Sequence, residues 1–152
     1  MENMAKLIIE NNVLIKYEGN EKTVNVPEGV KEIAFEAFFG NVYVENVNLP
    51  DSLTYIAPKA FSCMGKNFKK IIIPRHVEMI DYKAFDCDSL VEVHILNPNI
   101  SIHPEAFDHC YDLLDIYFSG TKEEWEKTRL VNEDDEPVDL RINKSVLVHY
   151  FD

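Results

Sequence analysis

The feature that most constrains this fold is a short internal repeat. The dipeptide Ala-Phe recurs with 23, 24 and 22 residues between successive alanines, at Ala37-Phe38, Ala60-Phe61, Ala84-Phe85 and Ala106-Phe107. Prolines and aliphatic residues on either side keep nearly the same interval. A unit of this length cannot bury its own hydrophobic face, so successive copies must stack on one another.

Each copy also carries a pair of apolar residues separated by one position, which is the alternation typical of a half-buried strand. The five pairs are Val24/Val26, Val47/Leu49, Ile71/Ile73, Val93/Ile95 and Ile116/Phe118. Stacked copies place these strands about 4.8 Å apart in a parallel ladder. A proline directly after a strand has no N–H to donate, so Pro27, Pro50 and Pro74 end the ladder and begin a turn. The pattern predicts a short solenoid of the α+β/β class.

The 152 residues fit one domain, divided into two caps and a repeat array. We expect residues 24–118 to form about four repeats of 22–24 residues. Residues 1–23 form the N-terminal cap, with a β-hairpin of segments 7–9 and 13–17 around Asn11-Asn12. Residues 119–152 form the C-terminal cap. There Thr121 and Glu124 match a capping box, which predicts a helix over 122–129 whose Trp125 seals the last coil. Segment 145–151 is predicted to be a final strand.

The charge pattern excludes several classes of function. A net charge of −12 repels phosphate backbones, so direct nucleic-acid binding is not expected. No segment approaches the ~20 apolar residues that cross a bilayer, and the first twenty residues carry five charges. We therefore expect no membrane insertion and a cytoplasmic location, or a cell-surface or secreted one for a trimmed chain. The acidic segment 133–139 is interpreted as a solvated loop, because it lacks the alternation and turn glycine of a calcium loop.

No residue constellation predicts catalysis, a metal or a cofactor, and we expect a protein that is not an enzyme. The three cysteines follow Ala-Phe at nearly equal offsets, which places Cys63, Cys87 and Cys110 in one column of the stack. Side chains in such a column point in parallel and do not converge on a zinc ion or meet in an unstrained disulfide. We interpret all three as reduced core cysteines. His109 and Cys110 are neighbours in sequence, but adjacent residues of an extended chain point apart.

The residue between the two members of each apolar pair must point away from the core. This outward column is Asn25, Asn48, Ile72, His94 and Tyr117. Its last three members form an apolar and aromatic strip, and such residues are enriched at protein interfaces. We predict that this column binds a protein partner. Two alternatives stay open: the caps or a dimer cover the column, or Ile72 is a single stray apolar residue.

The segment IIIPRHVEMIDYKAFDCDSLVEV, residues 71–93, resembles the BspA-like, treponemal-type leucine-rich repeats. The resemblance covers residues 24–118, and LIIENNVLIKYEGN and IYFSGTKEEW resemble the terminal caps of that family. It implies a right-handed, curved solenoid that serves as a non-catalytic protein-binding module, often adhesive and at bacterial or protist surfaces.

An alternative function follows from the −12 charge: an acidic inhibitor or nucleic-acid mimic that blocks a basic groove on a nucleic-acid-binding protein. A homodimer formed through an uncovered strand edge is a further expectation.

Overall fold

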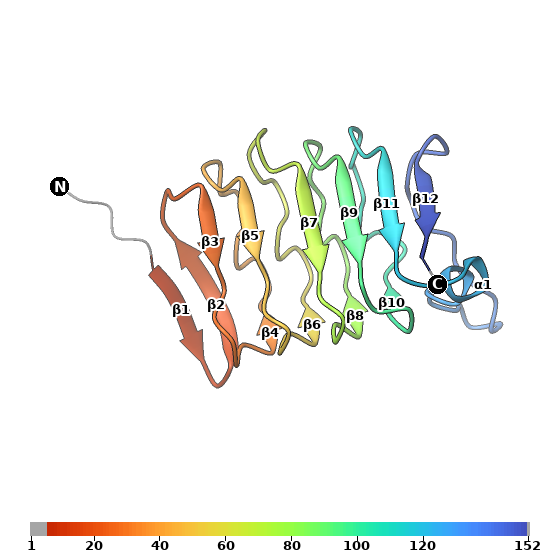
Figure 1. Ribbon diagram of the computed structural model, residues 1–152, viewed down its shortest axis with the longest axis horizontal. Coiled ribbons are helices and arrows are strands. Elements are labelled where there is room, and N and C mark those ends of the chain that lie inside the picture. Colours follow the sequence, from red (N-terminus) through yellow and green to blue (C-terminus); the bar gives the residue numbers. More distant parts are fainter. Residues whose placement is uncertain (1–5, 152) are drawn as a thin grey trace.

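Each coil of the chain contributes a strand to each of two rows that run along the molecule (Figure 1). The computed structural model describes residues 6–151. The first row contains β1 (Lys6–Glu10), β2 (Val13–Glu18), β4 (Glu32–Ile33), β6 (Tyr55–Ile56), β8 (Met79–Ile80) and β10 (Ser101–Ile102). The second contains β3 (Thr23–Asn25), β5 (Asn46–Asn48), β7 (Lys70–Ile73), β9 (Glu92–Ile95), β11 (Asp115–Phe118) and β12 (Leu147–Tyr150). The predicted solenoid is confirmed.

The first row begins with the predicted hairpin. β1 and β2 pair antiparallel, and the turn between them places Asn11 and Asn12 at φ 51° and 64°, a conformation that asparagine tolerates better than most residues. β2 then pairs in parallel with β4, and β4, β6, β8 and β10 follow in the same sense. The hairpin therefore covers the N-terminal end of the ladder and supplies its first parallel strand.

The second row is parallel throughout but is interrupted once. β3 pairs with β5, and β7, β9, β11 and β12 form a separate sheet, so β5 and β7 share no ladder hydrogen bonds. The wider space between these two strands is visible in Figure 1. The turn before β7 is one residue longer than its counterpart before β5, with 11 residues from Ala60 to Ile71 against 10 from Ala37 to Val47. That longer turn buries Met64 and Phe68, and the bulk of these side chains accounts for the wider spacing.

The core consists of rows of equivalent side chains, as predicted. The phenylalanines of the Ala-Phe dipeptides are all buried and their rings stack, with centroids 4.8, 5.0 and 5.7 Å apart from Phe38 through Phe61 and Phe85 to Phe107. Of the ten strand-pair residues predicted to point inward, nine are buried. The tenth, Leu49, is only partly buried, because it borders the interruption between β5 and β7.

The cysteine column was predicted incorrectly at one position. Cys87 and Cys110 are buried, but Cys63 is exposed. Cys63 occupies a left-handed turn position at φ 58°, as do Gly40 and His109 in other coils, and this backbone conformation directs its side chain into solvent. In the last copy the cysteine follows the turn residue by one position, so Cys110 returns to the core. All three thiols are free.

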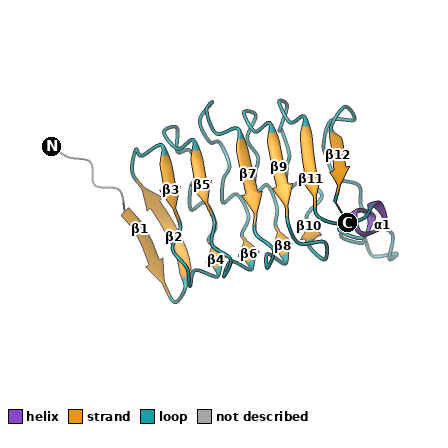
Figure 2. Cartoon of the chain, viewed as in Figure 1, coloured by secondary structure: helices purple, strands orange, loops and turns teal. Residues whose placement is uncertain are grey.

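The C-terminal end is closed by α1 (Lys122–Glu126), the one helix among residues 6–151 (Figure 2). Thr121 and Glu124 form the predicted capping box. Trp125 is buried and packs edge-on against Phe118, so the predicted seal on the last coil is confirmed. The helix ends earlier than predicted because the Thr128 carbonyl accepts a hydrogen bond from the amide of Ile102, which continues the first row.

β12 is shorter than the predicted segment 145–151 and lies in parallel beside β11. No helix within residues 6–151 has the length and apolar character to cross a lipid bilayer.

Candidate protein-binding face

The predicted outward column lies on the surface of the second row, but its two halves differ in chemistry. Asn25 and Asn48 are exposed at the N-terminal end, where Nδ2 of Asn48 donates a hydrogen bond of 2.7 Å to Oδ1 of Asn25. Ile72 follows on β7 with 46% of its surface exposed. The structure therefore brings the five predicted residues onto one face as a polar ladder followed by an apolar strip.

The C-terminal half of the column is a stack of rings. The ring of Tyr117 lies between those of His94 and His149, with centroid distances of 4.6 and 4.5 Å and interplanar angles of 18° and 12°. The ring of Phe151 is 6.1 Å from that of Tyr117. We refer to Ile72, His94, Tyr117, His149 and Phe151 as the aromatic strip.

His149 and Phe151 were not predicted to belong to this face. The sequence indicated a strand over 145–151 but provided no register for it, because this strand lies outside the repeat. In the structure His149 aligns with Tyr117, and Tyr150 with Phe118. The alternation of LVHYF, continued from β12, then turns His149 and Phe151 outward.

Carboxylates on the neighbouring outward positions hold the two histidines. Nε2 of His94 lies 2.6 Å from Oε2 of Glu92, and Nε2 of His149 lies 2.8 Å from Oδ1 of Asp115. Lys70 reaches the same Glu92 oxygen at 3.3 Å. The hydrogen bond from His94, aided by Lys70, lowers the pKa of Glu92 below its ordinary value. These contacts hold the two imidazole rings in place.

The stacking determines what the strip offers to another molecule. Both faces of the Tyr117 ring are occupied by imidazoles, so a flat ligand has no free face of that ring on which to stack. The ring edges are left for contact. Exposed apolar side chains at the ends of the same strands, Leu96, Leu114 and Leu147, are 39%, 56% and 61% exposed and enlarge the apolar surface. Large exposed apolar surfaces mark interaction sites.

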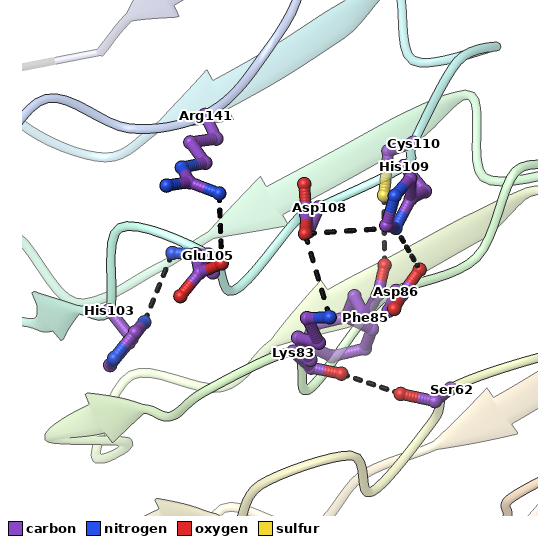
Figure 3. A network of polar contacts seen from close by, with 10 residues as sticks. All are labelled: Ser62, Lys83, Phe85, Asp86, His103, Glu105, Asp108, His109, Cys110 and Arg141. Atoms are coloured by element: carbon purple, nitrogen blue, oxygen red, sulfur yellow. Dashed lines mark hydrogen bonds and ion pairs between the residues drawn. The ribbon is translucent and has the colours of Figure 1, made fainter.

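The sequence neighbours His109 and Cys110 do not form a catalytic pair (Figure 3). The Cys110 thiol donates to the carbonyl of Phe85 at 2.8 Å, and burial raises its pKa to about 12. Nδ1 of His109 lies 3.1 Å from Asp86 and 3.6 Å from Asp108, so its contacts are with carboxylates. A buried, protonated thiol that donates to a main-chain carbonyl is a structural group and a poor nucleophile.

The other polar contacts of this region hold the C-terminal segment in place. The guanidinium of Arg141 lies 3.0 Å from Glu105 (Figure 3). The main-chain amide of Arg141 donates to the carbonyl of Pro104, and both contacts fasten the segment that follows the acidic loop to the fourth copy. Glu133, Asp134, Asp135 and Glu136 are all exposed, as expected for a solvated loop. Within residues 6–151 no cluster of three or more histidine, cysteine, aspartate or glutamate residues has the arrangement of a metal site.

Solved structures of bacterial leucine-rich repeat proteins are similar to this chain. A leucine-rich cell surface protein from Faecalibacterium prausnitzii has 25% identity and a TM-score of 0.56 over 76% of this chain and 37% of that one. A leucine-rich repeat protein from Bacteroides ovatus has 23% identity and a TM-score of 0.57 over 86% of this chain and 33% of that one. The chain thus spans about a third of the length of these proteins.

The pneumococcal vaccine antigen PcpA shares the fold at 16% identity, with a TM-score of 0.51 over 91% of this chain and 44% of that one. No curated protein is significantly similar to the chain. The family model of the BspA type leucine-rich repeat region matches residues 8–133 in six copies. With more than half of its length matched and with the solenoid described above, the chain belongs to the BspA-type leucine-rich repeat family.

Proposed function

We propose that this protein is a non-catalytic protein-binding module that contacts its partner through the aromatic strip. The observation that carries the proposal is the row of outward rings that follows Ile72, in which carboxylates hold both histidines by hydrogen bonds and exposed leucines lie at the strand ends. Leucine-rich repeat families are generally interaction modules, and this supports the same function.

The chemistry of the strip favours a protein partner. Its rings present edges, and the flanking leucines present aliphatic surface, so the face suits apolar side chains of another protein. The carboxylate oxygens of Glu92 and Asp115 at the centre are engaged by hydrogen bonds with His94 and His149, and Glu92 also by Lys70. An apolar centre with a polar surround is the anatomy of protein interfaces.

The test compares two double variants in affinity capture. Ile72→Asp with Tyr117→Asp places two charges in the strip, whereas Val42→Asp with Tyr43→Asp places two charges at an exposed apolar turn outside it. We expect proteins captured by the wild type to be retained by the turn variant and lost by the strip variant. Circular dichroism and thermal melts check that both variants are folded. Equal capture by the two variants would refute the proposal.

The alternative, an acidic inhibitor of a nucleic-acid-binding protein, is supported by the −12 charge and the exposed carboxylates of residues 133–136. It predicts a different behaviour in salt. Binding through many charge pairs weakens steeply as salt is added, whereas binding through the aromatic strip changes little. A strong salt dependence together with full binding by the strip variant would favour the inhibitor.

We further propose that the protein acts at a cell surface. The Faecalibacterium prausnitzii relative is a cell surface protein, and this supports a surface location over the cytoplasmic one expected from the sequence. Digestion of intact cells with an impermeant protease tests it: a surface protein is cleaved while a cytoplasmic marker survives. Protection of both proteins from digestion would indicate a cytoplasmic location instead.

A further inference from the structure

The interruption between β5 and β7 opens a groove on the same face as the aromatic strip. Its volume is about 370 Å³, and it is lined by Asn46, Asn48, Asp51, Lys70, Ile72 and Leu96 together with the strand backbones. We call it the β5/β7 groove. Known ligand pockets have volumes of ~300–1,000 Å³, so the groove is large enough to receive a small ligand.

The strands that form the groove leave main-chain groups without ladder partners. The amide of Asn46 donates to Lys22 and the carbonyl of Asn48 accepts from Val26, so both residues face β3. Main-chain groups alternate in direction along a strand, so those of Val47 face β7. On β7 the carbonyl of Ile73 accepts from Leu96 and so faces β9, and by the same alternation the main-chain groups of Lys70 and Ile72 face β5. Because β5 and β7 are not paired, these groups open into the groove.

The groove is too narrow for another strand. Inserting a strand requires its neighbours to stand about 9.6 Å apart, twice the usual spacing. Cα atoms of β5 and β7 still approach within 8 Å. A side chain or a small planar group fits such a gap, whereas an extended peptide does not.

The asparagine side chains set the polarity of the groove. Nδ2 of Asn48 donates to Asn25, and Nδ2 of Asn46 donates to Thr23, both on the β3 side. The amide oxygen lies opposite the nitrogen, so both Oδ1 atoms turn toward β7. Among residues 6–151 no donor reaches either oxygen. Two hydrogen-bond acceptors therefore point into the groove.

Of the residues that line the groove, Asp51 and Lys70 carry charges. The ammonium of Lys70 is directed to Glu92 on β9, away from β5. Asp51, at the end of the groove, has one carboxylate oxygen 3.3 Å from Arg75, which does not line the groove. This ion pair is largely exposed, so it is weak and can be shared. The contact with Arg75 also shows that this carboxylate accepts a guanidinium.

We infer that the β5/β7 groove binds the guanidinium group of an arginine side chain. The planar group fits between the two strands, its five N–H donors match the Asp51 carboxylate and the amide oxygens, and its methylene stem covers Ile72 and Leu96. Because the groove borders the aromatic strip, the arginine belongs to the partner protein. This last step rests on the proposed function, whereas the guanidinium site itself does not.

A titration with small molecules tests the site without any partner. N-acetyl-L-arginine amide is added over the millimolar range to ¹⁵N-labelled protein, and amide shifts are followed in two-dimensional NMR spectra. N-acetyl-L-citrulline amide, which carries a neutral urea of the same shape, is the control ligand. We expect saturable shifts at Val47, Lys70 and Ile72 with the arginine amide and much smaller shifts with the citrulline amide.

Two groove variants and one matched variant complete the test. Asp51→Asn should weaken arginine binding at least about threefold, the scale of an exposed charge contact. Asn48→Leu removes a hydrogen-bond acceptor and should also weaken it. Asp112→Asn removes one charge from an exposed turn outside the groove and should leave binding unchanged.

Absent shifts, equal shifts with both ligands, or full affinity in Asp51→Asn would overturn the inference. The aromatic strip is tested separately by partner capture, so either proposal can fail alone.

Discussion

The stacked phenylalanine rings of the core predict which side chains are energetically coupled. Phe61 is fully buried between Phe38 and Phe85, at centroid distances of 4.8 and 5.0 Å. Phe38 and Phe85 are separated by the ring of Phe61. Stacked aromatic pairs contribute ~0.5–1.5 kcal/mol beyond the area they bury, whereas residues without contact are additive within ~0.5 kcal/mol.

The perturbation is substitution by leucine, singly and in pairs. Each Phe→Leu change keeps an apolar side chain and should cost about 1.5 kcal/mol of unfolding free energy, a loss that a domain stable by ~5–15 kcal/mol tolerates. The Phe61→Leu/Phe85→Leu cycle should show a coupling of about 1 kcal/mol. The Phe38→Leu/Phe85→Leu cycle should show less than ~0.5 kcal/mol.

Equilibrium unfolding in urea measures all the variants, and unchanged m-values confirm that they unfold as the wild type does. Phe107 provides an internal comparison, because among residues 6–151 its ring stacks on that of Phe85 alone. Phe107→Leu should cost less than Phe61→Leu, whose ring also lies 6.0 Å from Phe68. Equal coupling in the adjacent and the separated pair, or none in the adjacent pair, would refute the nearest-neighbour reasoning for this core.

Acid stability should depend on Glu92. The hydrogen bond from His94 lowers the pKa of Glu92 from 4.5, so its stabilising contribution is present above pH 4.5 and is lost as pH falls through the lower, folded pKa. Thermal melts of Glu92→Gln should therefore lose less stability between neutral and acid pH than the wild type; identical pH profiles would contradict this. Thiol accessibility should differ as well. At pH 8 the native protein should react with a single equivalent of an excess thiol reagent, at Cys63. Burial raises the pKa of Cys87 and Cys110 to about 11 and 12, so these two thiols should stay unlabelled. Native labelling of three thiols would show that the buried ones are accessible.

The face of the protein could be predicted in part from its sequence. Strict alternation within each repeat places Asn25, Asn48, Ile72, His94 and Tyr117 on one outward column, because side chains of a strand point alternately to opposite faces. Their place on the surface follows from local geometry alone. Their role in binding is a prediction that the capture experiment tests.

The rest of the face depends on contacts between segments far apart in the chain. His149 stacks on Tyr117 across 32 residues of sequence, and the register of β12 is set by packing of a segment that carries no repeat. The β5/β7 groove likewise depends on how the buried Phe68 is accommodated in one coil. No pattern of residue types along the sequence indicates these contacts between distant segments.

The repeat by itself determined the solenoid and the inward rows, because a period of 22–24 residues with apolar columns has one way to bury those columns, and the flanking hairpin and capping-box patterns indicated the capped ends. Only the tertiary structure decided where the ladder opens, which rings complete the strip and where Cys63 points. These features arise from unequal turn lengths and side-chain volumes between neighbouring coils, whose consequences appear only when the coils are packed together.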